Sequence, residues 1–346
     1  MAEERAMKAV RFHEFGGPEV LQYEDVPDPQ LRKDQVLVRV RACAMNHLDL
    51  WVRKGLPGVK LPHLLGSDVA GEVVEVGEYV TGLQKGQRVI VAPMVFCGHC
   101  HFCASGVQNM CRDFTVLGNG VDGGNCELIA VRRDFVIPIP DSLSFEEASA
   151  VPLVGLTAWH MMVTRAQIRP GQNVLVLGAN SGVGMAAIQI GKLFNAYVIA
   201  TAGDEHKIQR ARELGADEVI NHYTQKISDE VKRITSKQMC DIVIEHVGQA
   251  TWGESMKSLK PGGAIVTCGA TSGPKAEFDL RVLFAKQLAF LGSYMGTMGE
   301  LHEVLKHVFS GRVKGVVDSA FPLAEARAAH ERMEKSQMFG KIVLKP

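Results

Sequence analysis

Several features are missing from this chain of 346 residues, and their absence excludes several classes of function. The 38 basic and 38 acidic side chains cancel, so no bulk positive field draws the protein to nucleic acid or to anionic lipid. No apolar run reaches about twenty residues, and the amino terminus carries charges of both signs instead of a signal peptide. Repeats and low-complexity linkers are absent as well. We therefore expect a cytoplasmic, unanchored protein without nucleic-acid or membrane partners.

The length and the hydrophobic content of 46% predict two domains with separate cores. From Met7 to about Pro140, short valine-rich stretches alternate with Gly, Asp and Pro, which is typical of a β-rich, barrel-like domain. Alternating strand and helix patterns follow and predict an α/β domain with a doubly wound parallel sheet. We place these domains at 1–153 and 154–296, and expect the segment 297–346 to return to the first domain.

A cysteine cluster interrupts the β-rich domain at VFCGHCHFCASGVQNMC, in a lobe spanning residues 95–112. In a reducing compartment, clustered thiols bind metals more often than they form disulfides. The spacing C-x2-C-x2-C-x7-C offers four thiolates that close a tetrahedral shell, which predicts one structural zinc per chain. An iron–sulfur cluster also uses four thiolates, although its final spacing usually differs. The expected ligands are Cys97, Cys100, Cys103 and Cys111.

A glycine-rich turn marks the second domain, within QNVLVLGANSGVGMAAIQIGKLFNAYVIATAG at residues 172–203. A short apolar strand precedes the turn, a helical pattern follows it, and a second strand comes at the distance typical of dinucleotide-binding domains. The free backbone N–H groups of such a turn can bind a pyrophosphate. Ala179 and Ser181 replace the first two glycines of the usual pattern. The predicted cofactor-binding residues are Ala179, Asn180, Ser181, Gly182, Val183 and Gly184.

The end of the second strand bears on the choice between NAD and NADP. An acidic side chain there accepts from the ribose 2′-hydroxyl of NAD, and Ala202 stands in its place. Lys207 lies within reach of a 2′-phosphate or is a solvated helix residue, and Asp204 or Glu205 can still serve a ribose. We expect NADP(H), with NAD(H) as the alternative. Loops at the carboxyl ends of later strands should also line the cofactor crevice, through Val247, Gly248 and Gly269.

The order of these motifs resembles the medium-chain dehydrogenase/reductase superfamily, which includes zinc alcohol dehydrogenases and quinone oxidoreductases. The likeness rests on GSDVAGEVVEVG, the cysteine lobe, VPLVGLTAWHMM, GANSGVG and the terminal FGKIVL, and covers nearly the whole chain. It implies a GroES-like catalytic domain, a Rossmann coenzyme domain, an active site between them, and a dimer or tetramer of the chain. The cysteine lobe matches the family's structural zinc site in all four ligands.

The catalytic zinc site of the family does not match. Its ligand positions hold Asn46, Ser67 and about Val154, which are poor zinc ligands or none. We therefore expect no catalytic zinc. The resemblance makes Asn46 an amide donor to a substrate oxygen, as in quinone oxidoreductases, while Trp51 stands where that branch often has a tyrosine.

The resemblance also gives roles to five further residues, each with an open alternative. His47 contacts the cofactor, relays a proton or only packs. Asp49 orients its neighbours or is an ordinary solvated or capping carboxylate. Asp68 borders the metal site of zinc members or rebuilds a degenerate metal site with His47 or His63. Thr157 lies near the nicotinamide or only packs, and Lys341 approaches the cofactor phosphates or lies on the surface.

These expectations favour an oxidoreductase that prefers NADP(H) and passes hydride to a small ketone, enone or quinone without a catalytic zinc. An alcohol dehydrogenase with an unorthodox catalytic metal site is the first alternative. A cofactor-binding protein with negligible turnover is the second.

Overall fold

The computed structural model describes residues 6–346 and divides the chain into two compact units. Unit 1 comprises Met1–Leu153 and Lys314–Pro346, and unit 2 comprises Val154–Val313. The C-terminal return therefore begins at Lys314, later than the expected position 297.

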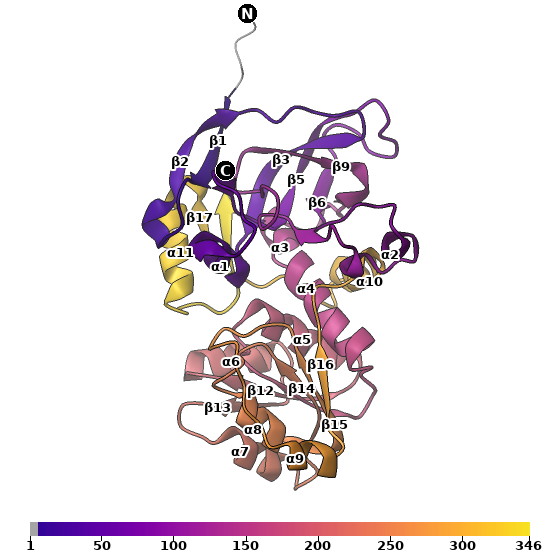
Figure 1. Cartoon of the computed structure of the whole chain (residues 1–346), viewed down its shortest axis with the longest axis vertical. Helices are drawn as coiled ribbons and strands as arrows, with labels where there is room; N and C mark the ends of the chain where they lie inside the picture. The colour runs from indigo at the N-terminus through magenta and orange to yellow at the C-terminus, as the bar shows by residue number, and fades with distance from the viewer. Residues whose placement is uncertain (1–5) are drawn as a thin grey trace, which may run out of the picture. The chain divides into compact units, whose positions relative to one another are not determined.

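Unit 1 is rich in β-structure, as its valine pattern predicts (Figure 1). A seven-stranded sheet runs in the order β10-β6-β5-β3-β18-β17, with β9 paired to β3; β2-β1-β4 and β7-β8 form two smaller sheets. The strands are β1 (Ala6–Phe12), β2 (Gln22–Pro27), β3 (Gln35–Ala44), β4 (His63–Leu64), β5 (Asp68–Val76), β6 (Arg88–Val91), β7 (Met94–Val95), β8 (Thr115–Val116), β9 (Leu128–Arg132), β10 (Val136–Pro138), β17 (Val317–Pro322) and β18 (Lys341–Lys345). The helices are α1 (His47–Gly55), α2 (His101–Ala104), α3 (Phe145–Ser149) and α11 (Ala326–Glu334).

The central strand β3 shows why this sequence forms a sheet. Its β-branched Val36, Val38 and Val40 point to one side and are almost completely buried, while alternate positions are more exposed. β18 pairs antiparallel with β3, placing Val343 opposite Ala44. The C-terminal strand thereby brings Lys341 next to the end of β3, where the chain enters α1.

A buried arginine ties α11 to α1. Arg53 is 0% exposed and donates to Nδ1 of His330 at 2.9 Å and to Glu334 at 2.6 Å. Burial lowers the pKa of His330 to about 3, so its ring is neutral and Nδ1 accepts the bond. A buried arginine paired in this way fixes the helix that begins next to Asn46.

Unit 2 contains the predicted doubly wound parallel sheet. All its strand pairs are parallel, in the order β13-β12-β11-β14-β15-β16. The strands are β11 (Asn173–Val176), β12 (Tyr197–Ala202), β13 (Glu218–Asn221), β14 (Cys240–Glu245), β15 (Leu259–Thr267) and β16 (Ala289–Gly292). The helices between these strands, drawn around the sheet in Figure 1, are α5 (Gly182–Leu193), α6 (Glu205–Glu213), α7 (Ile227–Ile234), α8 (Trp252–Lys257) and α9 (Leu280–Ala285). The helix α4 (Pro152–Trp159) precedes the first strand of the sheet, and α10 (Met298–Phe309) follows the last.

The helix α10 belongs to unit 2 because its side chains bond to the end of α4. A π-helical turn, His160–Arg165, continues α4, and Nδ1 of His160 lies 2.8 Å from Oε1 of Glu300. The rings of Trp159 and His307 stack at 5.4 Å. Because of these contacts α10 is part of unit 2, and the return segment begins after it, at Lys314.

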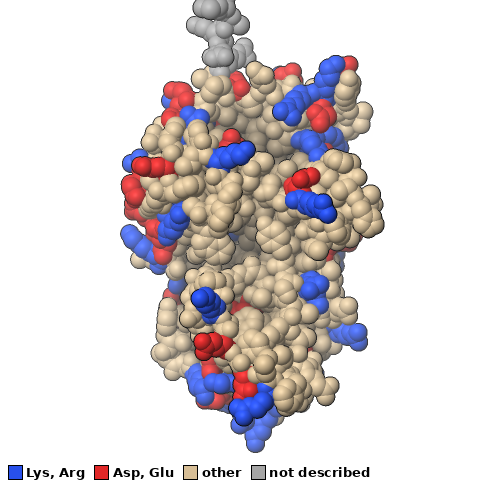
Figure 2. Space-filling model, in the orientation of Figure 1, with Lys and Arg blue, Asp and Glu red and all other residues tan. Residues whose placement is uncertain are grey.

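Charged side chains of both signs are interspersed over the face shown in Figure 2, consistent with the balanced composition. None of the helices within residues 6–346 has the length and apolar character needed to cross a membrane.

Candidate functional site

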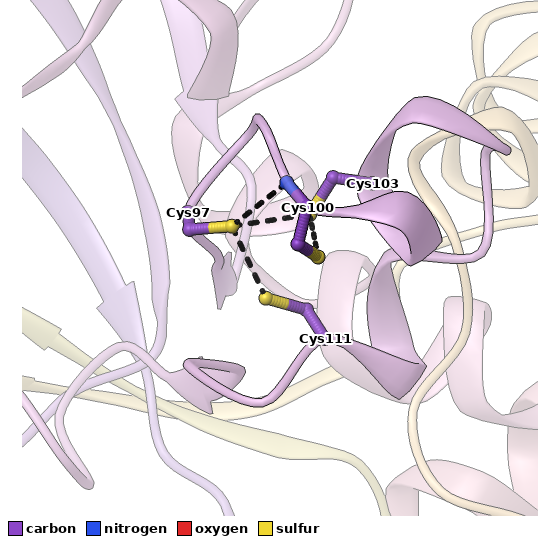
Figure 3. A group of neighbouring side chains, drawn as sticks. All are labelled: Cys97, Cys100, Cys103 and Cys111. Atoms are coloured by element: carbon purple, nitrogen blue, oxygen red, sulfur yellow. Dashed lines mark hydrogen bonds between the residues drawn. The ribbon is translucent and has the colours of Figure 1, made fainter.

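The cysteine lobe brings its four sulfur atoms together (Figure 3). All four Sγ atoms lie within 4.8 Å of one another, and the shortest contact, between Cys100 and Cys103, measures 3.5 Å. A tetrahedral zinc with Zn–S bonds of about 2.3 Å requires sulfur atoms roughly 3.8 Å apart. Gly98, with φ of +84°, provides the left-handed turn between the first two cysteines. The donor set and its spacing therefore fit a zinc ion.

Backbone donors prepare one of these thiols for metal binding. The N–H groups of His99 and Cys100 lower the pKa of the Cys97 thiol to about 6. The N–H of Cys100 lies 3.4 Å from the Cys97 sulfur. Since the thiolate is the metal ligand, the loop favours the ligating form at neutral pH.

A second polar cluster lies in unit 1 at the start of α1 and contains Asn46, Asp68 and Lys341. Lys341 Nζ donates to Asn46 Oδ1 at 2.5 Å and to Asp68 Oδ2 at 3.0 Å. Asn46 Nδ2 donates to the same Asp68 oxygen at 2.9 Å. The other oxygen, Oδ1, accepts from the backbone N–H of Leu153 at 2.8 Å. The three side chains are 5%, 0% and 3% exposed, so they form one buried, hydrogen-bonded unit.

This cluster corrects the expectation for Lys341. A surface position is wrong, because the side chain is buried, and its ammonium group is bound to Asn46 and Asp68. The predicted contact with the cofactor phosphates stays a prediction. The cluster also restricts Asn46. Its carbonyl oxygen and one N–H are in use, and its second N–H has only a long contact of 3.5 Å to the carbonyl of Ala44.

Asp49 and Ser67 flank this cluster. Asp49 accepts from the backbone N–H of Asn46 at 2.7 Å and from that of Gly66 at 3.2 Å, so it links α1 to the turn before β5. Burial raises the pKa of Asp49 to about 6, against these two bonds. Of the alternatives expected for Asp49, the solvated carboxylate is wrong, because the side chain is buried. The capping carboxylate is confirmed, because Asp49 belongs to the capping box at the start of α1. Ser67 is 0% exposed, and its hydroxyl has no hydrogen-bond partner among residues 6–346.

The histidines of unit 1 do not rebuild a metal site with Asp68. His63 is held by the carbonyl of Gly118 at 3.1 Å and by Asp122 at 3.3 Å. His47 is exposed and packs edge-on against Trp51, with ring centroids 5.1 Å apart. In the part of the chain that the structure describes, the four cysteines form the only group of three or more His, Cys, Asp or Glu side chains suited to a metal ion.

The glycine turn of unit 2 has the predicted strand, turn and helix around it. Ser181 caps α5 by accepting from the N–H of Gly184 at 2.9 Å. A Cβ at Gly184 would lie 2.2 Å from the carbonyl oxygen of Gly178, so only glycine fits there. The N–H of Gly178 itself donates to Oγ1 of Thr201 at 3.0 Å, which joins the turn to β12.

The loop after β14 is fixed by a buried carboxylate that the sequence analysis missed. Glu245 is 0% exposed and accepts from the N–H groups of Val247 at 2.7 Å and Gly248 at 3.0 Å. The hydroxyls of Thr251 and Ser255 also donate to it, at 2.9 and 2.7 Å. Four donors around one carboxylate tie the loop after β14 to the start of α8. The sequence pattern gives no signal for this role. Glu245 follows a run of apolar residues, and an acidic residue at the end of a strand is ordinary whether or not it is buried.

The end of β12 contains a pair of opposite charges. Ala202 is buried, while Asp204 begins α6 by accepting from the N–H of Lys207 at 2.9 Å. Lys207 Nζ lies 3.1 Å from Asp204 Oδ2. The backbone N–H of Lys207 lowers the pKa of the Asp204 carboxyl most, and the ammonium group of the same lysine lowers it further. Lysine and acid therefore lie together at the start of α6, just after β12.

The remaining predicted residues lie in unit 2. Thr157, in α4, is 6% exposed, with its hydroxyl 3.9 Å from the sulfur of Met295. Gly269 follows β15, and a Cβ there would lie 3.1 Å from the carbonyl oxygen of His246. The turn residues Asn180, Gly182 and Val183 are partly exposed, and Ala179 is buried.

Comparison with known proteins decides the family. Residues 32–141 match the alcohol dehydrogenase GroES-like domain, and residues 182–310 match the zinc-binding dehydrogenase domain. An alcohol dehydrogenase of Geobacillus stearothermophilus is 35% identical over 98% of this chain and 99% of its own length. The chain belongs to the medium-chain dehydrogenase/reductase superfamily.

Relatives in this superfamily differ in their named activities. A quinone oxidoreductase of Pseudomonas aeruginosa is 32% identical over 98% of this chain and 99% of its own length. The solved structure of an NAD-dependent alcohol dehydrogenase is 42% identical, covers 98% of this chain and 100% of that one, and has a TM-score of 0.96. Full-length likeness to both branches makes this protein an oxidoreductase of the alcohol dehydrogenase and quinone reductase type.

Proposed function

We propose that this protein reduces a small quinone, enone or ketone with NADP(H), without a catalytic zinc. The observation that carries the proposal is the buried cluster of Asn46, Asp68 and Lys341. The ammonium group of Lys341 already balances the charge of Asp68, at 3.0 Å. A zinc ion next to Asp68 would be repelled by the buried ammonium group of Lys341. Asn46, Ser67 and Val154 are also poor zinc ligands or none.

The residues of the cluster supply hydrogen bonds for a substrate oxygen. The bound cofactor supplies the hydride. The second N–H of Asn46 and the hydroxyl of Ser67 are the donors that the fold leaves least engaged. Lys341 polarises the Asn46 amide by bonding to its oxygen, which strengthens the remaining N–H as a donor. Such donors stabilise the oxyanion that forms when hydride attacks a conjugated carbon.

Support for NADP(H) comes from Ala202 and Lys207. Ala202 replaces the acid that accepts from the ribose of NAD, and Lys207 provides a cation near the same strand end. The similarity to the solved structure named an NAD-dependent alcohol dehydrogenase favours the opposite preference, for NADH over NADPH. Steady-state kinetics with NADPH and NADH, on wild type and Lys207→Ala, separate the two. We expect Lys207→Ala to raise the KM for NADPH about tenfold and to leave that for NADH unchanged, since a charged hydrogen bond contributes about 1.5–3 kcal/mol.

The first experiment is zinc analysis of protein purified without added metal and dialysed against a mild chelator, with NADPH oxidation assayed on the same sample. We expect about one zinc per chain, bound by the four cysteines, and turnover with quinones or enones that survives dialysis. Cys103→Ser serves as the matched control, because it should lower the zinc content of the lobe while the Asn46 cluster stays intact.

An alcohol dehydrogenase is the second candidate, and the named alcohol dehydrogenase relatives favour it. It predicts two zinc ions per chain and oxidation of secondary alcohols that a chelator abolishes. That result would reject the zinc-free mechanism. Binding of NADPH with no turnover across the electrophile panel would reject both enzymes in favour of a cofactor-binding protein.

Self-association of the chain is part of the proposal. Short helix α9 has no buried residue although five of its six residues are apolar or alanine, and Leu280 and Phe284 are 64% and 69% exposed. It precedes β16, the last strand of the parallel sheet. An exposed apolar patch beside an edge strand suits a second copy of the chain. Light scattering coupled to gel filtration should give a dimer or tetramer, which Phe284→Lys weakens.

A further inference from the structure

A histidine ring lies against the glycine turn of unit 2. Nε2 of His246 is 2.8 Å from the carbonyl oxygen of Leu177 and 3.1 Å from Oγ of Ser181. Its Cε1 atom would lie 3.1 Å from a Cβ at Gly178. One side chain from the loop after β14 thus contacts both ends of the turn that follows β11.

The partners of His246 settle where its proton lies. A carbonyl oxygen can only accept, so Nε2 must carry the hydrogen that bonds to Leu177. Burial lowers the pKa of His246, which keeps the ring neutral and leaves Nδ1 without a proton. Nε2 carries a single hydrogen, which the Leu177 carbonyl at 2.8 Å and Ser181 Oγ at 3.1 Å share as acceptors. Ser181 therefore cannot donate its own hydrogen to this nitrogen.

The hydroxyl of Ser181 then has a defined direction. Its oxygen also accepts from the N–H of Gly184 at 2.9 Å, so both of its lone pairs are in use. The remaining bonding capacity of the hydroxyl is its own hydrogen, which must be donated away from His246 and Gly184. A hydroxyl at the start of α5 whose hydrogen is directed in this way is suited to an anionic oxygen.

We propose that His246 is a positioning residue that holds the Ser181 hydroxyl as a hydrogen donor to a phosphate oxygen of the nicotinamide dinucleotide. The inference rests on the proposed cofactor function of this turn. Glu245 supports it, because its bonds to the N–H groups of Val247 and Gly248 fix the backbone from which the imidazole extends.

The test is a double-mutant cycle on the full-length protein, with His246→Phe, Ser181→Ala and the double variant. Phenylalanine keeps the ring shape and removes the N–H. We expect His246→Phe to weaken NADPH binding about 3- to 10-fold, as loss of one oriented hydrogen bond does. The KM for NADPH should rise by the same factor and kcat should stay unchanged. In the Ser181→Ala background, His246→Phe should have no further effect.

Two further variants separate positioning from damage to the fold. His246→Gln keeps an N–H donor at similar reach and should bind NADPH within about twofold of wild type. His302→Phe, at an exposed position of α10, is the matched control and should change nothing. Thermal unfolding of every variant identifies any that has lost its fold, in which case His246→Gln and Ser181→Ala still complete the comparison.

Three results would overturn the inference. Wild-type affinity in His246→Phe would show that the N–H is unimportant, and effects that multiply in the double variant would show that the histidine acts independently of Ser181. Weak binding by His246→Gln equal to that of His246→Phe would assign the effect to packing. These results leave the proposed function standing, whereas a wild-type protein that binds neither NADPH nor NADH rejects both.

Discussion

Asp68 in unit 1 and Glu245 in unit 2 are both 0% exposed, but their charges are balanced in different ways. Asp68, the first residue of β5, bonds to the ammonium group of Lys341. Glu245, the last residue of β14, forms no ion pair within residues 6–346 and instead accepts from two backbone N–H groups and two hydroxyls. Hydroxyls rotate and can exchange donor for acceptor roles, whereas an ammonium group can only donate. The cluster around Asp68 should therefore tolerate chemical change less well than the loop around Glu245.

The largest effect is expected when Asp68 is replaced by Asn. The change leaves the buried ammonium of Lys341 without its counter-charge, and breaking a buried pair from one side costs about 3–5 kcal/mol. Denaturant unfolding should show this loss in the free energy of unfolding. In Asp68→Asn combined with Lys341→Met, the uncompensated charge is gone, and most of the stability should return. A double variant no more stable than Asp68→Asn would contradict the charge argument.

Asp49 extends the comparison to a buried carboxylate that accepts hydrogen bonds from the backbone N–H groups of Asn46 and Gly66. Its pKa in the folded protein, about 6, lies above the ordinary value of 3.8. The folded state therefore binds the proton more tightly, so this group stabilises the fold below about pH 4, and that contribution is lost as the pH rises through 6. The loss amounts to at most about 3 kcal/mol, at 1.36 kcal/mol per pKa unit.

Unfolding free energies measured from pH 4 to pH 8 test this sign. Asp49→Asn should remove the decrease between pH 4 and pH 6, while Asp34→Asn, at an exposed position, should keep the wild-type profile. A variant whose stability still falls over that range would assign the effect to another group.

Glu245→Gln is the same chemical change as Asp68→Asn, made in the other unit. The glutamine oxygen can still accept from the N–H groups of Val247 and Gly248, and the hydroxyls can turn to accept from its amide nitrogen. Only the added strength of charged hydrogen bonds is lost, about 1–2 kcal/mol. Amide hydrogen exchange at Val247 and Gly248 should accelerate along with this loss. A cost equal to that of Asp68→Asn would show that the two carboxylates depend equally on their charge.

The sequence reveals the cysteine lobe and the glycine turn better than the cluster around Asp68, because the partners in that cluster lie far apart along the chain. The first and last of the four cysteines lie 14 positions apart, so their spacing alone predicts one site. The strand, glycine turn and helix around Ser181 are also contiguous, and periodicity predicts them. Lys341 meets Asp68 across 273 positions, and nothing in the local sequence FGKIVL indicates an internal ion pair. Long-range pairing of β18 with β3 creates that contact, which only the folded chain shows.

The smallest effect is expected at the surface. Lys33 and Glu78 form an ion pair at 2.7 Å with side chains 62% and 65% exposed. Water screens both charges whether or not they are paired, so Glu78→Gln should change the free energy of unfolding by less than about 0.5 kcal/mol. Denaturant unfolding at low and high salt measures it beside Asp68→Asn, whose effect should be nearly independent of salt. A cost for Glu78→Gln as large as that for Asp68→Asn would mean that burial is not what makes the Asp68 pair strong.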